Sequence, residues 1–385
     1  MASCYEAYAD ACAAAEIAPL VHVLDAMANS PLGVIDARGF SGGIRLGDVD
    51  CGPLGEAVAL SGCTALYASN NEIGDEGVAA LVACGRVATL NTLDLSVNNI
   101  GGAGATALCN ALVAEASQLF ELTLDGNPLG ESGGGAVAAL LSTHGTIESL
   151  RLARCELNAA ALVGIASALA RTTTLRVLDV SETRTHSRNE ETVAHFARAL
   201  RANTSLERLT ARKLAHLSDS GVEALCDALL DNTTLRELDL SANALGPPSG
   251  ITLAKALADG APLAVLQLSA CRMGDQGAAA LAATLARSSG SASASGGCSL
   301  RVLDLRYNNI GDAGIAALAA ALASPECLLE TLFWWGNPGL QPGSAGAAAW
   351  GAALESGGVR AVTDVRAFYV DGNVHCARED LPLPA

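Results

Sequence analysis

The chain has 385 residues, 50% of them hydrophobic, and a formal net charge of −17. Its apolar content is sufficient for a large core. Only Lys213 and Lys255 are lysines, and the strong negative charge argues against the phosphate-neutralising surface that nucleic acids require. No uncharged apolar run is long enough to span a membrane. We therefore expect neither a nucleic acid nor a membrane as partner.

The start of the chain and the cysteines indicate a cellular compartment. Residues 1–20 contain no lysine or arginine, which fits neither a secretory leader nor an arginine-rich transit peptide. Twelve cysteines are scattered from Cys4 to Cys376 without a Cys-x-x-Cys pair. Such thiols are typical of reduced cytosolic proteins. We expect a cytoplasmic location.

Residues 1–31 are rich in alanine, and Pro19 lies near the start of a second helical stretch that runs towards Met27. This pattern predicts a helical N-terminal cap over residues 1–31.

From residue 32 one pattern recurs about every 28 residues. Its clearest copy is Leu90-x-x-Leu93-x-Leu95-x-x-Asn98-x-Ile100-Gly101. Nine further copies, some of them degenerate, begin at Cys63, Leu119, Ile147, Leu175, Leu206, Leu235, Leu263, Leu300 and Leu329. With one more plausible copy at each end, we expect about 10–12 repeats over residues 32–365.

Each position of the repeat has a physical role. The Leu-x-Leu alternation predicts a short strand with one buried face. The asparagine is placed to bond backbone groups of the turn, and Cys155 and Cys271 occupy the same slot. A glycine that we expect in a left-handed turn follows at Gly74, Gly101, Gly130, Gly274 and Gly311. We expect the next residue to cap the helix that begins there, as at Asp75, Asp275 and Asp312.

Strand, helix and parallel strand, repeated with right-handed crossovers, predict an α/β solenoid. Parallel strands would line the concave face of a horseshoe and helices its convex face. In these repeats the chain resembles the ribonuclease-inhibitor-like class of leucine-rich repeat proteins, over residues 32–365, with residues 366–385 as a C-terminal cap and tail. The resemblance implies this fold. It says less of function, because inhibitors, immune-receptor sensor domains, GTPase activators and scaffolds share the architecture.

Two segments interrupt the pattern. Residues 181–192 are polar, and the surrounding residues 171–217 carry nine basic against five acidic side chains. We interpret this island as a contact for an acidic partner or as solvated helix faces. Residues 288–297 contain only Ser, Gly and Ala, which is typical of a flexible linker.

An aromatic cluster, Leu332-Phe333-Trp334-Trp335, stands out in a chain with 3% aromatic residues. Strand alternation places Trp334 inwards, and Phe333 and Trp335 outwards beside Arg306 and Tyr307. Exposed Trp, Tyr and Arg dominate interface energetics. The cluster therefore predicts a partner-binding site, with shielding of the solenoid's end as the alternative.

The same alternation places further side chains on the concave face: Tyr67, Asp94, Arg151, Asp179, Arg212, Asp239 and Asp304. We include them as candidate contacts. The aspartates equally fit a structural or solubility role.

No catalytic chemistry emerges from the motifs. The six histidines lack metal-ligand spacing, and neither lysine belongs to a phosphate-binding loop. Two Gly-x-Ser-x-Gly matches are expected by chance among forty glycines. We therefore predict no enzyme, no cofactor and no metal. The prediction is a monomeric interaction module or scaffold that binds a protein partner on its concave face.

Resemblance offers one alternative, a GTPase-activating protein for a Ran-like small GTPase. Ran GTPase-activating proteins have this solenoid and carry an arginine in an early Phe-Thr-Gly-Arg-like segment. The segment Phe40-Ser41-Gly42 is similar, but Gly43 stands where the arginine would be and Arg45 follows two residues later. Activation requires an accurately placed charge, so the departure matters.

Overall fold

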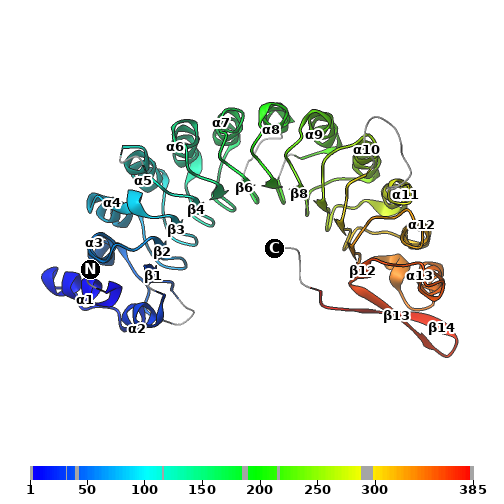
Figure 1. The fold of residues 1–385 in the computed structure, drawn as a ribbon, viewed down its shortest axis with the longest axis horizontal. Coiled ribbons are helices and arrows are strands. Elements are labelled where there is room, and N and C mark those ends of the chain that lie inside the picture. The colour runs from blue at the N-terminus through cyan, green and yellow to red at the C-terminus, as the bar shows by residue number, and fades with distance from the viewer. Residues whose placement is uncertain are drawn as a thin grey trace. The chain divides into compact units, whose positions relative to one another are not determined.

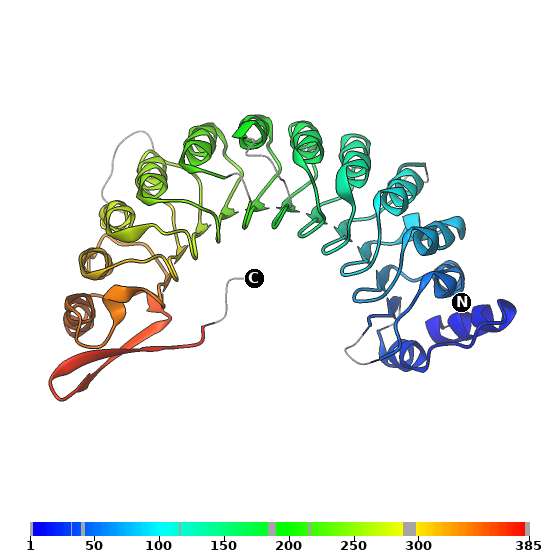
Figure 2. The ribbon, with the colours of Figure 1, turned by 180° about the vertical axis from the view of Figure 1, so that it is seen from behind.

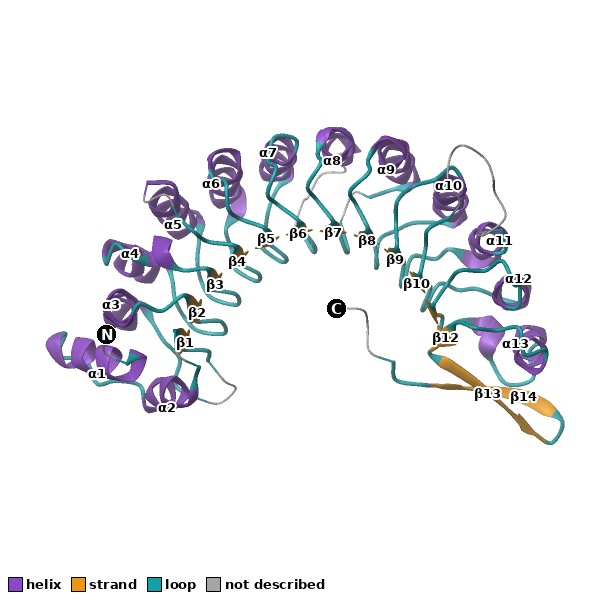
Figure 3. Ribbon diagram, in the orientation of Figure 1, coloured by secondary structure: helices purple, strands orange, loops and turns teal. Residues whose placement is uncertain are grey.

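The computed structural model describes residues 3–31, 33–39, 43–114, 117–183, 190–214, 217–287 and 298–381. The chain forms two compact units, Met1–Ser187 and Arg188–Ala385. Within each unit, short parallel strands form one layer and helices form the other (Figures 1 and 3). This confirms the α/β solenoid predicted from the repeats.

Unit 1 starts with two helices that precede the first strand, and α1 packs against α3. Its helices are α1 Cys4–Ala14, α2 Val21–Asn29, α3 Cys51–Ser61, α4 Asp75–Ala83, α5 Gly102–Ala114, α6 Gly130–Thr143 and α7 Ala159–Leu169, with 3-10 turns at Asp48–Asp50 and Val87–Thr89. Its strands are β1 Val34–Asp36, β2 Ala65–Tyr67, β3 Thr92–Asp94, β4 Glu121–Thr123, β5 Ser149–Arg151 and β6 Val177–Asp179.

Unit 2 repeats the arrangement and adds a hairpin that projects beyond α13 (Figures 1 and 2). Its helices are α8 Glu190–Ala202, α9 Asp219–Asp231, α10 Pro247–Ala258, α11 Gly274–Leu285, α12 Asp312–Leu322 and α13 Ala345–Glu355, with a 3-10 turn at Pro338–Leu340. Its parallel strands are β7 Arg208–Thr210, β8 Glu237–Asp239, β9 Val265–Gln267, β10 Val302–Asp304, β11 Thr331–Phe333 and β12 Val362–Thr363, and its antiparallel hairpin is β13 Val365–Val370 and β14 Asn373–Arg378.

Neighbouring strands pair without a register shift, so Leu93 lies opposite Leu66 and Leu122. The middle residue of each three-residue strand, Ile35 in β1 and a leucine in the others, is buried against the helices. The residues on either side of it point the opposite way, because side chains alternate along a strand. We call the surface that these flanking residues form, on the side away from the helices, the strand face.

The repeat asparagines bond backbone groups as predicted, and their bonds also join consecutive repeats. The Asn98 amide donates to the carbonyl of Ala68, in the preceding repeat, at 2.9 Å, and its Oδ1 accepts from the N–H of Ile73 at 3.1 Å. Cys155 and Cys271 replace one of these asparagine bonds. Each thiol donates to a carbonyl of the preceding repeat, at 3.1 and 3.2 Å. The structural role expected for these two cysteines is confirmed.

The prediction for the helix-capping aspartates was wrong in one respect. Asp75 caps the helix of the next repeat rather than its own, because its Oδ1 accepts from the N–H groups of Gly101 and Gly104 at 2.7 and 2.8 Å. Asp275 serves Gly311 in the same way at 2.6 Å. The cap crosses the repeat boundary because the helix starts of neighbouring repeats lie side by side.

The same contacts correct the expectation for the turn glycines. Of the five turn glycines, only Gly130 and Gly274 have a positive φ, 63° and 58°. In the repeats that precede these two, the position of the capping aspartate is occupied by Gly102 and Pro247. At Gly101 the reason for glycine is close approach, since a Cβ there would lie 3.1 Å from the Asp75 carboxylate. A small residue is therefore needed wherever the carboxylate of the preceding repeat's aspartate binds the N–H of the turn glycine.

Both interruptions fall largely outside the described residues, which omit 184–189 and 288–297. None of the helices in the described part of the chain has the length and hydropathy of a membrane span.

Candidate protein-interaction site

The predicted contact residues all lie on the strand face or in the turn that directly follows a strand. They divide between the two units. Unit 1 holds Tyr67, Asp94, Arg151 and Asp179, and unit 2 holds Arg212, Asp239, Asp304, Arg306, Tyr307, Phe333 and Trp335.

In unit 2, Arg306 lies in the turn after β10 and contacts strand-face residues of both β10 and β11. Its guanidinium and its own backbone N–H both bind the Asp304 carboxylate, at 2.5 Å from Nη2 to Oδ2 and 3.0 Å from N to Oδ1. The guanidinium also lies 5.1 Å from the centroid of the Phe333 ring, a cation–π distance. Hydrogen bonding to Asp304 raises the pKa of Arg306. With Asp364, these residues form what we call the Arg306 cluster.

The expected exposure of Phe333 was wrong. Strand alternation does direct it away from Trp334, but only 1% of its surface is exposed. The reason is the Arg306 guanidinium, which lies over the ring from the preceding repeat. Trp334 points inwards as predicted and meets Trp350 edge-on, with ring centroids 5.0 Å apart.

Asp364 completes the end of the sheet. Strand β12 ends at Thr363, and the Asp364 carboxylate then accepts from the N–H groups of Trp334 at 2.8 Å and Trp335 at 3.3 Å. Burial raises the pKa of Asp364, and these two N–H groups partly oppose the shift, as does Arg306. The carboxylate thereby fixes the backbone on which the Trp335 side chain is carried.

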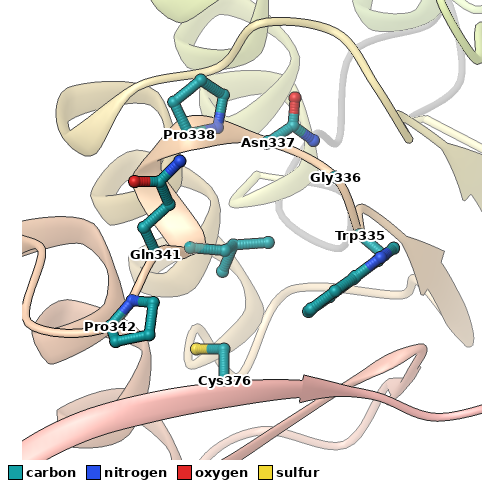
Figure 4. A pocket seen from close by; sticks show the side chains of 8 residues that line it. Trp335, Gly336, Asn337, Pro338, Gln341, Pro342 and Cys376 are labelled. Carbon is teal, nitrogen blue, oxygen red and sulfur yellow. The ribbon is translucent and has the colours of Figure 1, made fainter.

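Tyr307 is exposed and Trp335 partly exposed in this region. Tyr307 is 52% exposed, its N–H donates to the Trp335 carbonyl at 3.1 Å, and its ring covers Gly336, where a side chain would clash. Trp335 is half-buried and borders a pocket of about 270 Å³. The pocket is lined by Trp335, Gly336, Asn337, Pro338, Leu340, Gln341, Pro342 and Cys376. Figure 4 shows Trp335 facing Gln341 and Pro342 across it, with Cys376 reaching in from β14.

Unit 1 contains a matching group that the sequence analysis missed, the Arg38 cluster of Asp36, Arg38, Tyr67 and Asp94. Arg38 binds Asp36 through Nε at 2.9 Å and Nη2 at 2.5 Å, and its guanidinium lies 5.5 Å from the Tyr67 ring centroid. Hydrogen bonding to Arg38 holds the pKa of Asp36 below its ordinary value. A signal was present, because Asp36-x-Arg38 and Asp304-x-Arg306 are each followed by an aromatic residue one repeat later.

The remaining candidates differ in burial. Asp239 is only 9% exposed, burial raises its pKa, and Arg212 approaches it at 3.7 Å from Nε to Oδ2. Arg151 is exposed and lies opposite Asp179 in the sheet register. A further carboxylate that was missed, Asp125 in the turn after β4, accepts from the N–H of Ala153 at 2.6 Å, and burial raises its pKa to about 6.

Arg45, the residue of the alternative GTPase-activator hypothesis, is exposed. The neighbouring Phe40, Ser41 and Gly42 lie outside the described residues.

Comparison with known proteins agrees with the repeat architecture. A leucine-rich repeat family matches residues 65–82, 88–109, 231–254, 262–282 and 298–319. The ribonuclease inhibitor of Mus musculus is 32% identical over 192 residues, and that of Sus scrofa is 31% identical over 187 residues. The chain is a leucine-rich repeat protein of the ribonuclease-inhibitor-like class. The match covers 48% of this leucine-rich repeat chain and 40% of either inhibitor.

Two solved structures match the chain at lower sequence identity. A chain of the yeast Rad7 and Elc1 complex is 17% identical, with 76% of this chain and 80% of that chain covered at a TM-score of 0.44. An internalin from Listeria monocytogenes is 15% identical, with 88% and 89% covered at a TM-score of 0.40. Neither likeness supports a conclusion about function. The leucine-rich repeats themselves indicate a protein-interaction module.

Proposed function

We propose that this leucine-rich repeat protein is a non-enzymatic module that binds a protein partner through the strand face of unit 2, with Tyr307 and Trp335 as the main contacts. One observation carries the proposal. Two adjacent aromatic side chains are accessible beside a pocket of about 270 Å³, in a chain with few aromatic residues. Tyrosine and tryptophan are enriched among the residues that dominate binding energy.

The site is formed before a partner arrives. Asp364 holds the N–H groups of Trp334 and Trp335, and the Tyr307 N–H bonds the Trp335 carbonyl. The Tyr307 ring also rests on Gly336. Because the contact residues are already ordered, binding incurs little additional loss of conformational entropy.

The chemistry of the pocket indicates what it accepts. Pro338, Leu340 and Pro342 supply apolar surface, and Gln341 adds an exposed amide. The Asn337 amide is already used, since it donates to the carbonyls of Leu305 and Trp334 at 2.9 and 2.7 Å. We expect the pocket to take one apolar side chain of the partner, with Gln341 bonding the partner's backbone beside it.

Arg306 contributes to the site chiefly as support. Its charge is balanced by Asp304, and its guanidinium packs on Phe333, so a partner gains little from pairing with it. Asp239 is balanced similarly by Arg212. The proposal therefore rests on aromatic and apolar contacts rather than on opposite charge.

The test is affinity capture followed by titration calorimetry with the captured partner. Trp335→Ala and Tyr307→Ala should each weaken binding by about tenfold or more. Leu230→Ala is the control, because Leu230 is 46% exposed on helix α9, away from the strand face. Unfolding midpoints should stay close to the wild type, and undiminished binding by both aromatic variants would refute the site.

A GTPase-activating role is not part of the proposal, because residues 40–42, on which it would rely, lie outside the described residues. The cytoplasmic location stays a prediction.

A further inference from the structure

The C-terminal hairpin leaves one strand edge open. Strands β13 and β14 pair from Val365 opposite Arg378 to Val370 opposite Asn373. The turn between them is Asp371-Gly372, with φ of 50° and 79°. In a two-residue hairpin the pair beside the turn is hydrogen-bonded and such pairs then alternate. The backbone groups of Ala367 and Tyr369 therefore point away from β14.

Other backbone groups at the edges of the hairpin are occupied. On β14, the Val374 carbonyl accepts from the N–H of Gly343 at 3.1 Å. On β13, the Val365 carbonyl accepts from the Thr363 hydroxyl at 2.9 Å. Within the described part of the chain, the backbone N–H and C=O of Ala367 and Tyr369 have no hydrogen-bond partner.

The side chains of β13 divide between two faces. Val365 is buried, and the Tyr369 hydroxyl donates to Glu355 on α13 at 2.6 Å, so this face is turned towards the helix. Phe368 and Val370, on the other face, are 38% and 41% exposed, and the Phe368 ring lies 5.7 Å from that of His375 on β14. An exposed apolar strand with an open edge is a template for another strand.

We propose that this edge binds the same edge of a second copy of the chain, with the two β13 strands antiparallel and the two-fold axis at Phe368. This register places Ala367 of each copy opposite Tyr369 of the other and pairs all the open backbone groups. A register centred on Ala367 would require the Val365 carbonyl, which Thr363 already occupies. One centred on Tyr369 would place Ala367 opposite Asp371, in the turn.

The side chains are self-complementary in the same register. Phe368 faces its own counterpart in a non-hydrogen-bonded pair, where side chains approach closest. Val370 faces Arg366, whose aliphatic stem can cover it, and no like charges stand directly opposite. A pair of short strands buries less than the ~1,600 Å² of a standard interface, so the dimer should dissociate on dilution. The monomer expected from the sequence would be the dilute form.

Sedimentation velocity of the full chain from about 1 to about 200 μM tests the association. The wild type should shift to a dimer at high concentration. Phe368→Lys, which sets two like charges opposite one another, should weaken dimerisation about tenfold or more. Leu354→Lys is the matched control, since Leu354 is also 38% exposed but lies on α13. A wild type that stays monomeric over the whole range overturns the proposal.

Cysteine cross-linking tests the register. In Phe368→Cys the two new thiols would lie directly opposite, with Cα atoms about 4.5 Å apart, within disulfide range. In Val370→Cys the two new thiols would be four residues apart along the strands, about 14 Å. Mild oxidation should therefore link the first variant and leave the second at the wild-type level. Equal linking of both would overturn the proposal. Trp335→Ala should dimerise normally, which separates this test from that of partner binding.

Discussion

The Arg38 cluster of unit 1 and the Arg306 cluster of unit 2 use the same slots of the repeat. Each has an aspartate at the end of a strand and an arginine two residues later. The aromatic residue is the register partner of that aspartate, Tyr67 for Asp36 and Phe333 for Asp304. A second aspartate follows one repeat later, Asp94 in one case and Asp364 in the other.

The two clusters differ in burial. The Arg38 and Asp36 side chains are 57% and 24% exposed, whereas those of Arg306 and Asp304 are 18% and 2% exposed. Within the described residues, the Asp94 carboxylate accepts hydrogen bonds only from its own turn, from the N–H and hydroxyl of Ser96. Asp364 instead accepts from the N–H groups that follow β11 in the preceding repeat. Burial is thus set by what the neighbouring repeat supplies, not by the slot itself.

The largest difference should come from removing the arginines. Arg306→Ala leaves the buried Asp304 carboxylate without its counter-charge, which should cost about 4 kcal/mol of unfolding free energy. Arg38→Ala removes an exposed pair and should cost at most about 1 kcal/mol. Urea unfolding of both variants measures the difference, and similar losses would show that the two clusters are energetically alike.

The aromatic residues should show a smaller contrast. Phe333→Ala removes a ring that is 1% exposed and should cost about 3 kcal/mol. Tyr67→Ala removes a partly exposed ring and should cost about 1 kcal/mol. Thermal unfolding gives both values. A Phe333→Ala variant as stable as Tyr67→Ala would contradict the burial of Phe333.

The smallest expected effect is a dependence of stability on pH. It tests whether burial also raises the pKa of a carboxylate in unit 1. The pKa of Asp125 is raised by burial from 3.8 to about 6, with Asp179 adding to the shift. Because the folded state favours the protonated form, this contribution to stability is complete below about pH 4 and is lost as the pH rises through about 6.

Asp125→Asn should therefore gain stability relative to the wild type between pH 4 and 6, on the order of 1 kcal/mol. Chemical unfolding at a series of pH values measures the gain. Parallel pH profiles for the two proteins would mean that Asp125 is not desolvated.

The fold was predictable because its signals are local and repeated. The leucine spacing predicts the strands, and the asparagine slot predicts the hydrogen bonds to backbone groups of the turn, as at Asn98. The errors concern contacts between repeats. Nothing within one repeat shows that Asp75 caps the next helix, or that Arg306 lies over Phe333.

The candidate site was predictable in part. Trp335 and Tyr307 could be proposed because aromatic residues are rare in this chain, whereas the pattern of a single repeat does not show that Arg38 meets Tyr67 of the next repeat. The hairpin falls almost entirely within the predicted C-terminal cap, residues 366–385, because it lies where the repeat pattern ends. Its open edge depends on which backbone groups Gly343 and Thr363 already occupy, which only coordinates reveal.

Because each of these aspartates caps the helix of the following repeat, the repeats depend on one another in one direction along the chain. Asp75 and Asp275 each stabilise a helix that is synthesised after them, so a repeat loses its own cap when its predecessor is removed, but keeps it when its successor is removed. Truncation from the N-terminal side should therefore fray the first remaining helix. Anyone who shortens or recombines these repeats should cut so that each aspartate stays with the glycine one repeat downstream.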